Sequence, residues 1–147
     1  MSGNRLREAT RWFQQARYDL EAVNWNIQGK FYDTACFLSQ QAAEKALKSL
    51  MYYLGARRKA IFTHSLMDMV KEGQKHVGAL ADAINDAKEL DLHYVPSRYP
   101  NGLPSGFPHQ FYGIEMAEKA LHAATKIFAI IQEFYQLKRE QEILKFD

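Results

Sequence analysis

Apolar residues recur at steps of three and four over most of the chain, which is the spacing of an amphipathic α-helix. This pattern predicts a first helix over residues 6–27, with Gly29 placed to end it in the left-handed conformation. A second helix is predicted from Asp33 to Leu54 and is closed by Gly55. Alanines flank its apolar positions and let other helices approach closely. We therefore expect this helix to be the central one.

Further helices are predicted in the rest of the chain. Thr63 or Ser65 can cap a helix that continues through residue 70, and the helical pattern resumes over residues 80–90 and 114–135. No segment alternates with a period of two, so no strand is predicted. The expected fold is all-α, an antiparallel up-and-down bundle of four to five helices.

A long irregular loop is predicted over residues 94–113, before the last helix. It holds all four prolines of the chain, and proline removes a backbone donor and restricts the residue before it. It has no acidic residue and carries five aromatic residues, which disordered linkers lack. Because loops of this length in compact bundles are either functional or disordered, the aromatic residues favour a functional loop.

Length and composition indicate one small domain and exclude several kinds of functional site. The chain has 147 residues with a formal net charge of +2, so we expect one domain over residues 1–147, with its core at about 5–135 and a charged extension over 136–147 that lengthens the last helix or frays. The single cysteine, Cys36, suits a reducing cytoplasm. No apolar run approaches the ~20 residues that span a bilayer, and no secretion signal is expected. The histidines lack metal-ligand spacing, so neither metal nor cofactor is predicted.

Two basic features are candidates for function. Arg57, Arg58 and Lys59 are adjacent, and His64 stands at the start of the next predicted helix. Three neighbouring cations repel one another, and a phosphate would relieve that repulsion. The alternative is that they are ordinary exposed residues, favoured by the dipole at the end of the preceding helix. From these residues alone, the alternative carries more weight.

The second basic feature is Arg98 in the aromatic loop. Its guanidinium group can bind phosphate while neighbouring rings stack on a base, and Tyr94, Tyr99 and Phe107 are candidates for that stacking. The alternative is that the rings pin the loop to the bundle and Arg98 caps a carbonyl. If Arg98 contacts a ligand, Arg98→Ala weakens binding and leaves thermal stability nearly unchanged.

Gln40 is a polar residue within the apolar pattern of the second helix. Inside a core it needs hydrogen-bond partners or costs ~1–3 kcal/mol, so it either pairs across a helix or subunit interface or lies at the margin of the apolar face. On the same helix, Glu44 can pair with Lys48 at a spacing of four residues.

Four segments resemble the HEPN domain family. The run over residues 35–48, with its Gln-Gln-Ala-Ala-Glu-Lys-Ala-Leu-Lys, is similar to the family's second-helix signature, and residues 16–20 are similar to its Ala-x-x-Asp-Leu element. The His-Ser-Leu at 64–66 resembles the start of the family's third helix, and the Arg-Tyr-Pro at 98–100 resembles the sacsin-like branch. The resemblance covers about residues 5–135.

The resemblance implies a helical bundle that commonly forms a homodimer. Family members are often encoded or fused with minimal nucleotidyltransferases, which implies such a protein as a partner. Some members are ribonuclease toxins, which act on RNA, and others bind nucleotides. A dimer also agrees with four long apolar patterns, whose faces exceed what one small bundle covers.

The ribonuclease branch uses an arginine followed four to six residues later by a histidine, near the start of the last long helix. In this chain that arginine is Arg98, positions 103–105 hold no histidine, and His109 comes too late. Arg58 and His64 have the spacing but lie between the second and third helices. Without an imidazole to move the 2′-hydroxyl proton, cleavage lacks its base or acid, so catalysis is not expected.

The sequence therefore predicts a non-catalytic, dimeric HEPN module that binds a nucleotide or another phosphate-bearing ligand. Phosphate would be bound by Arg57, Arg58, Lys59 and Arg98, with a hydrogen bond from His64 and stacking on Tyr94, Tyr99 or Phe107. This requires the two basic segments to line one cavity. The alternative is a metal-independent ribonuclease toxin of a HEPN/nucleotidyltransferase toxin–antitoxin pair, with Arg98 and His109 brought together by the loop.

Overall fold

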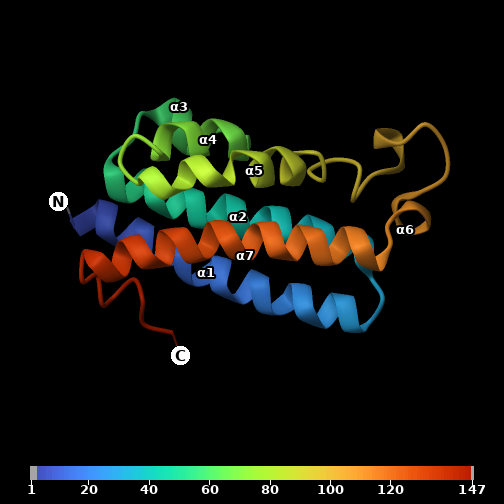
Figure 1. Ribbon diagram of the computed structural model, residues 1–147, viewed down its shortest axis with the longest axis horizontal. Helices are drawn as coiled ribbons and strands as arrows, with labels where there is room; N and C mark the ends of the chain where they lie inside the picture. The colour runs from blue at the N-terminus through green and yellow to red at the C-terminus, as the bar shows by residue number, and fades with distance from the viewer. Residues whose placement is uncertain (1–2, 147) are drawn as a thin grey trace.

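Three long helices form the body of the molecule (Figure 1). The computed structural model describes residues 3–146. The long helices are α1 (Gly3–Gln28), α2 (Tyr32–Leu54) and α7 (Ile114–Leu137). The shorter elements are α3 (Arg58–Phe62), α4 (Leu66–Gly73), the 3-10 helix η1 (Gly78–Ala83), α5 (Ile84–Asp91), the 3-10 helix η2 (Pro100–Gly102) and α6 (Pro108–Phe111). Residues 3–146 contain no strand, and the predicted all-α fold is confirmed.

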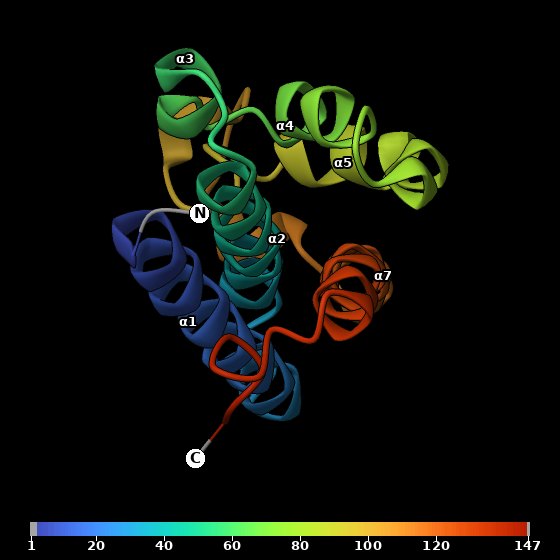
Figure 2. The same cartoon turned by 90° about the vertical axis from the view of Figure 1, so that its left-hand side faces the viewer.

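The second helix is the central one, as its alanines predicted. Viewed along the bundle, α2 lies between α1 and α7, while α4 and α5 lie over its remaining side (Figure 2). Fourteen of its 23 residues are buried, Ala35, Ala42, Ala43 and Ala46 among them. The two outer long helices also contact each other, because the Phe13 ring of α1 stacks on Phe128 of α7 with ring centroids 4.4 Å apart. Small residues on α2 thus let two long helices reach it at close range.

The two predicted glycine caps differ in outcome. Gly55 ends α2 in the left-handed conformation, with φ 65°, as predicted. The prediction for Gly29 is wrong, because Lys30 adopts the left-handed φ of 66° there instead. The Gly29 amide still bonds to the Trp25 carbonyl, so the helical turn continues through Gly29, and the amide of Phe31 then closes the Schellman motif on Asn26.

The basic connection after α2 is partly helical, which the sequence did not predict. Residues 58–62 form the short helix α3, with Arg57 as its N-terminal flanking residue. Ser65 rather than Thr63 caps α4, since its hydroxyl accepts a hydrogen bond from the amide of Asp68. The carboxylate of Asp91 accepts hydrogen bonds from two more amides at this helix start, at 2.8 and 3.1 Å. These contacts fix the position of the residue before Ser65, which is His64.

The predicted loop over residues 94–113 is largely irregular, and its short helices η2 and α6 begin at Pro100 and Pro108. Proline is favoured at the first position of a helix, because its missing amide has no partner there. Buried groups hold the loop to the bundle. The His93 Nδ1 lies 3.0 Å from the Tyr112 hydroxyl, and the Ser97 hydroxyl donates to the carbonyl of His93.

The C-terminal segment corrects the expectation that residues 136–147 lengthen the last helix or fray. Helix α7 ends at Leu137, and the chain reverses at Arg139, whose φ is 57°. The following residues pack on α1. Ile143 is fully buried, and the side-chain amide of Gln14 donates to two carbonyls of the segment. Apolar residues among the charges therefore dock this segment, while Asp147 lies outside the described residues.

Candidate functional site

Arg98 lies in a cage of three aromatic rings. The central carbon of its guanidinium group is 4.4 Å from the ring centroid of Phe37, 4.7 Å from Tyr94 and 4.9 Å from Tyr99. Its Nε donates a 2.8 Å hydrogen bond to the carbonyl of Tyr94. Within residues 3–146, the two terminal nitrogens make no hydrogen bond or ion pair. Phe37 comes from α2, so the loop is attached to the central helix through this arginine.

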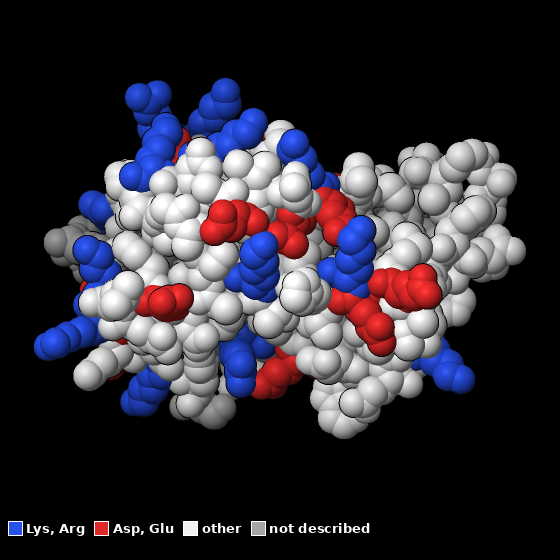
Figure 3. Space-filling view, viewed as in Figure 1, with Lys and Arg blue, Asp and Glu red and all other residues white. Residues whose placement is uncertain are grey.

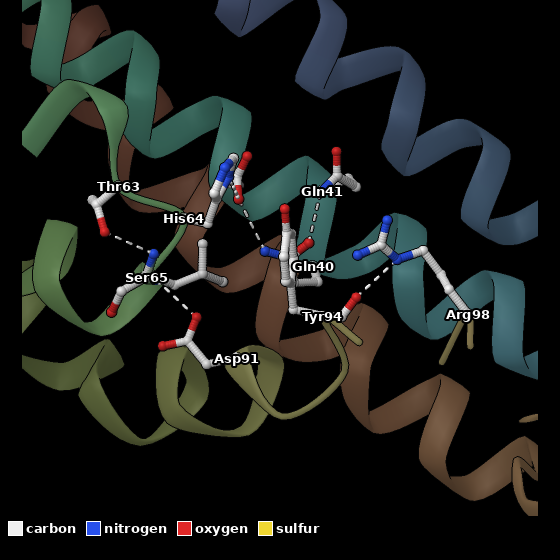
Figure 4. A network of polar contacts seen from close by, with 10 residues as sticks. Gln40, Gln41, Thr63, His64, Ser65, Asp91, Tyr94 and Arg98 are labelled. Carbon is white, nitrogen blue, oxygen red and sulfur yellow. Dashed lines mark hydrogen bonds and ion pairs between the residues drawn. The ribbon is translucent and has the colours of Figure 1, made fainter. Parts of the chain in front are cut away.

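Tyr94 connects Arg98 to His64 (Figure 4). The imidazole of His64 stacks on the Tyr94 ring, with centroids 5.2 Å apart and planes 23° apart. The His64 side chain is 60% exposed, and its Nδ1 lies 3.3 Å from an Oε1 of the buried Glu44. Two segments that are thirty residues apart in sequence thus meet on one face of α2. Of the predicted site residues, the structure brings His64, Tyr94, Arg98 and Tyr99 together.

Buried amides continue this network along α2. Gln40 is fully buried, and its Nε2 donates to the same Glu44 oxygen at 3.2 Å, while its Oε1 accepts from Gln41 at 2.8 Å. The prediction that Gln40 needs partners is confirmed, and the partners lie on its own helix rather than across an interface. Glu44 is held by Gln40 and His64, so its carboxylate is fixed behind the imidazole.

His109, the histidine of the loop, lies on the same face of α2. His109 Nδ1 is 3.0 Å from Asp33 Oδ1, and its ring lies 5.9 Å from that of Phe31. Asp33 and Phe37 are four residues apart, which places His109 and Arg98 over successive turns of one helix face. Phe107, the third predicted stacking residue, is half exposed and belongs to the end of the loop before α6.

The basic stretch lies at a groove away from the ring cage of Arg98. A groove of about 670 Å³ between α3 and α4 is bordered by Arg57 and Lys59 but by neither Arg98 nor His64. The Arg58 guanidinium lies 5.2 Å from the ring centroid of Phe62. Thr63, the neighbour of His64, is among the residues that line the groove. Arg57 and Lys59 therefore do not line one cavity with Arg98, and the expectation that the two basic segments converge is wrong.

Two features of α2 were missed from the sequence. Phe37 completes the ring cage, and Lys48 is only 6% exposed without the expected ion pair to Glu44. The Lys48 ammonium lies 5.6 Å from the ring centroid of Trp12, and no carboxylate within residues 3–146 pairs with it. The recurrence of polar or aromatic residues at 37, 41, 44 and 48 is the signal that marks this face as a continuous stripe.

Titratable groups behind the loop are shifted towards their neutral forms. Burial raises the pKa of the Cys36 thiol to about 12, and Asp33 adds to that shift, so the thiol is not a nucleophile near neutral pH. Burial likewise lowers the pKa of His93 and raises that of Tyr112 to about 12. Within the described part of the chain, no group of three histidine, cysteine or acidic side chains could hold a metal ion. No helix among these residues is long and apolar enough to cross a membrane.

Comparisons with known proteins point to one family. The model of the HEPN domain family matches residues 9–134. "Putative toxin MJ1304" of Methanocaldococcus jannaschii is 27% identical over 145 residues, which cover 93% of this chain and 94% of that protein. Human sacsin is 23% identical over 133 residues, which cover 89% of this chain and 3% of sacsin.

Solved structures agree with the sequence matches. TT1696 from Thermus thermophilus is 37% identical with a TM-score of 0.78, and the match covers 85% of this chain and 96% of that one. ST0689, an archaeal HEPN homologue, is 32% identical with a TM-score of 0.71, covering 86% and 96%. A HEPN domain protein of Thermotoga maritima is 30% identical with a TM-score of 0.67, covering 86% and 98%.

Proposed function

The chain belongs to the HEPN family, and on this premise we propose that it is a non-catalytic module that binds a nucleotide or another phosphate-bearing ligand at Arg98. The observation that carries the proposal is the ring cage, which fixes the guanidinium group while its terminal nitrogens stay without partners in residues 3–146. A planar guanidinium group with free donors binds phosphate through two parallel hydrogen bonds.

The rings around Arg98 supply the second half of the site. Tyr99 is half exposed and Tyr94 already stacks on His64, so a base can extend this row of flat groups. Stacking on an aromatic side chain is worth about 1–3 kcal/mol per base. His64, whose Nδ1 faces Glu44, can hydrogen-bond to the ligand with its other ring nitrogen. Phe107 remains a candidate for stacking.

The oligomeric state and partners are part of the same proposal. The end of the molecule that carries the loop exposes Phe107, Phe111 and Ile114, each close to half exposed, and we propose that a second copy of the chain covers them. A minimal nucleotidyltransferase as the protein partner rests on the family alone. A cytoplasmic location is supported by the single cysteine, which is buried and free.

Calorimetry with a panel of nucleoside mono-, di- and triphosphates tests the binding function. Wild-type protein should bind at least one class, and Arg98→Lys should weaken that binding at least tenfold, because an ammonium group cannot form the paired hydrogen bonds. Arg58→Lys, which changes a guanidinium group that rests on the exposed Phe62 ring, is the matched control. If wild-type protein binds neither a nucleotide nor inorganic phosphate or pyrophosphate at millimolar concentration, the proposed function is wrong.

A ribonuclease toxin is the second candidate, favoured by the attachment of Arg98 and His109 to successive turns of α2. In that case His109 moves the 2′-hydroxyl proton and Arg98 stabilises the phosphorane charge without a metal ion. The relative named as a toxin fits this alternative. An RNA degradation assay decides between the two. Cleavage by the wild type that both Arg98→Ala and His109→Ala abolish would replace the binding module with an enzyme.

A further inference from the structure

A groove lies between α3 and α4, and cations dominate its wall. It has a volume of about 670 Å³, within the range of ligand-binding clefts. Four cations line it, Arg57, Lys59, Lys71 and Lys75, against two carboxylates, Asp68 and Glu72. Figure 3 shows positively charged side chains gathered at the corner of the molecule formed by these helices.

Most of this positive charge is unpaired. Lys75 forms a 2.8 Å ion pair with Glu72, but within residues 3–146 no carboxylate pairs with Arg57, Lys59 or Lys71. The hydrogen bond and the charge of Lys75 lower the pKa of Glu72, and the charge of Arg57, which also lines the groove, adds to this effect. Three cations are therefore available to a bound anion.

The groove also has an apolar surface. Phe62 and Ala60 line it. Phe62 is 62% exposed even though the guanidinium group of Arg58 lies over its ring. Exposed apolar surface framed by charge is typical of protein interaction sites. A ligand that fills this groove therefore needs both anionic groups and an apolar part.

We propose that this groove docks an acidic, amphipathic segment of a partner protein. Its carboxylates pair with Arg57, Lys59 and Lys71, and an apolar side chain covers Phe62. Asp68 and Glu72 disfavour a nucleic-acid strand as the ligand. Phosphates bound along the groove would be repelled by these two carboxylates and would donate no hydrogen bond to them. A polypeptide can present an amide or a cation at those positions. The proposal is independent of ligand binding at Arg98, which shares no lining residue with the groove.

Fluorescence anisotropy with defined probes tests the proposal. The probes are a labelled 14-residue amphipathic peptide with four glutamates around central leucines, the same peptide with glutamine for glutamate, the same peptide with serine for leucine, and a 14-nucleotide oligouridylate. Each is titrated with wild-type protein at low salt, where surface electrostatics are least screened. The variants are the charge reversal R57E/K71E, Phe62→Ser, and the control reversal R7E/K145E, which removes the same charge elsewhere.

The acidic peptide should bind wild-type protein at least tenfold more tightly than either altered peptide or the oligouridylate. R57E/K71E and Phe62→Ser should each weaken that binding at least tenfold, and R7E/K145E should leave it within twofold. Circular dichroism checks that each variant is folded. Equal loss in the control reversal, tighter binding of the oligouridylate, or no binding of the acidic peptide by the folded wild type would each overturn the proposal.

Discussion

Replacing Arg98 with alanine should destabilise the protein as well as remove its ligand contact. The sequence predicted little change in thermal stability, but the structure adds three ring contacts and one hydrogen bond to the carbonyl of Tyr94. Each cation–π contact is worth about 0.5–1 kcal/mol at a partly exposed site, and the hydrogen bond about 0.5–1.5 kcal/mol. The expected loss is therefore about 2–4.5 kcal/mol.

Thermal and urea unfolding measure this loss directly. A chain of this size loses about 2–4 °C of melting temperature per kcal/mol, so Arg98→Ala should melt about 4–18 °C below the wild type. Arg58→Ala removes a guanidinium group that contacts one exposed ring, Phe62, and should melt only about 1–4 °C below the wild type. If the two variants melt at the same temperature, the ring cage does not hold the loop and the reasoning fails.

Three further predictions concern buried groups. Lys48→Met removes a buried ammonium group without a carboxylate partner, so the free energy of unfolding measured in urea should be unchanged or higher. The control Lys45→Met breaks the 2.5 Å ion pair with Asp19 and should cost about 0.5–1 kcal/mol. A large loss of stability in Lys48→Met alone would contradict this reasoning. Burial lowers the pKa of His93 from 6.5, so neutral His93 supports the fold above pH 6.5, and this stability falls as the pH drops from 6.5 through the folded-state pKa. His93→Gln should flatten that part of the pH profile of unfolding, and an unchanged slope would exclude His93 as its source. Ile143→Ala opens a cavity under the C-terminal segment and should cost about 2–4 kcal/mol in urea unfolding, while a loss below about 0.5 kcal/mol would mean that the segment is not docked.

The long helices could be predicted because their packing repeats with the period of the helix. Helix α2 is packed on several sides, and its buried residues account for the apolar pattern seen in the sequence. Gly55 adopts the left-handed conformation that its position after Leu54 predicted. Gly29 looked identical in sequence, yet hydrogen bonding extended the turn and gave the positive φ to Lys30. The end of a helix depends on a few hydrogen bonds, and the spacing of apolar residues along the sequence does not predict which of them form.

The candidate site was predictable only residue by residue. His64, Tyr94 and Arg98 were identified as functional types, but their stacking depends on how the loop and the start of α4 settle on α2. Glu44 illustrates the difficulty, because the local rule paired it with Lys48 while the fold placed His64 and Gln40 within reach. Contacts of this kind, between residues far apart in sequence, decided the partners of Glu44. The spacing of residues along one helix cannot predict such contacts.

The separation of the basic segments has the same origin. Adjacent cations after α2 suggested a shared cavity with Arg98, but residues 58–62 form a short helix whose side chains line a groove with α4. The loop instead folds back over the first half of α2, where Phe37 receives Arg98. Neither the turn of helix nor the direction of the loop follows from charge pattern, because both are set by tertiary packing.

Nuclear magnetic resonance of the arginine side chains tests the central claim most directly. Titration with a nucleotide that calorimetry shows to bind should shift the guanidinium signals of Arg98 saturably, together with the ring protons of Tyr94 and Tyr99, as expected for phosphate on the fork and a base on the rings. Saturable shifts confined to other residues, with the Arg98 signals unmoved, would contradict the claim.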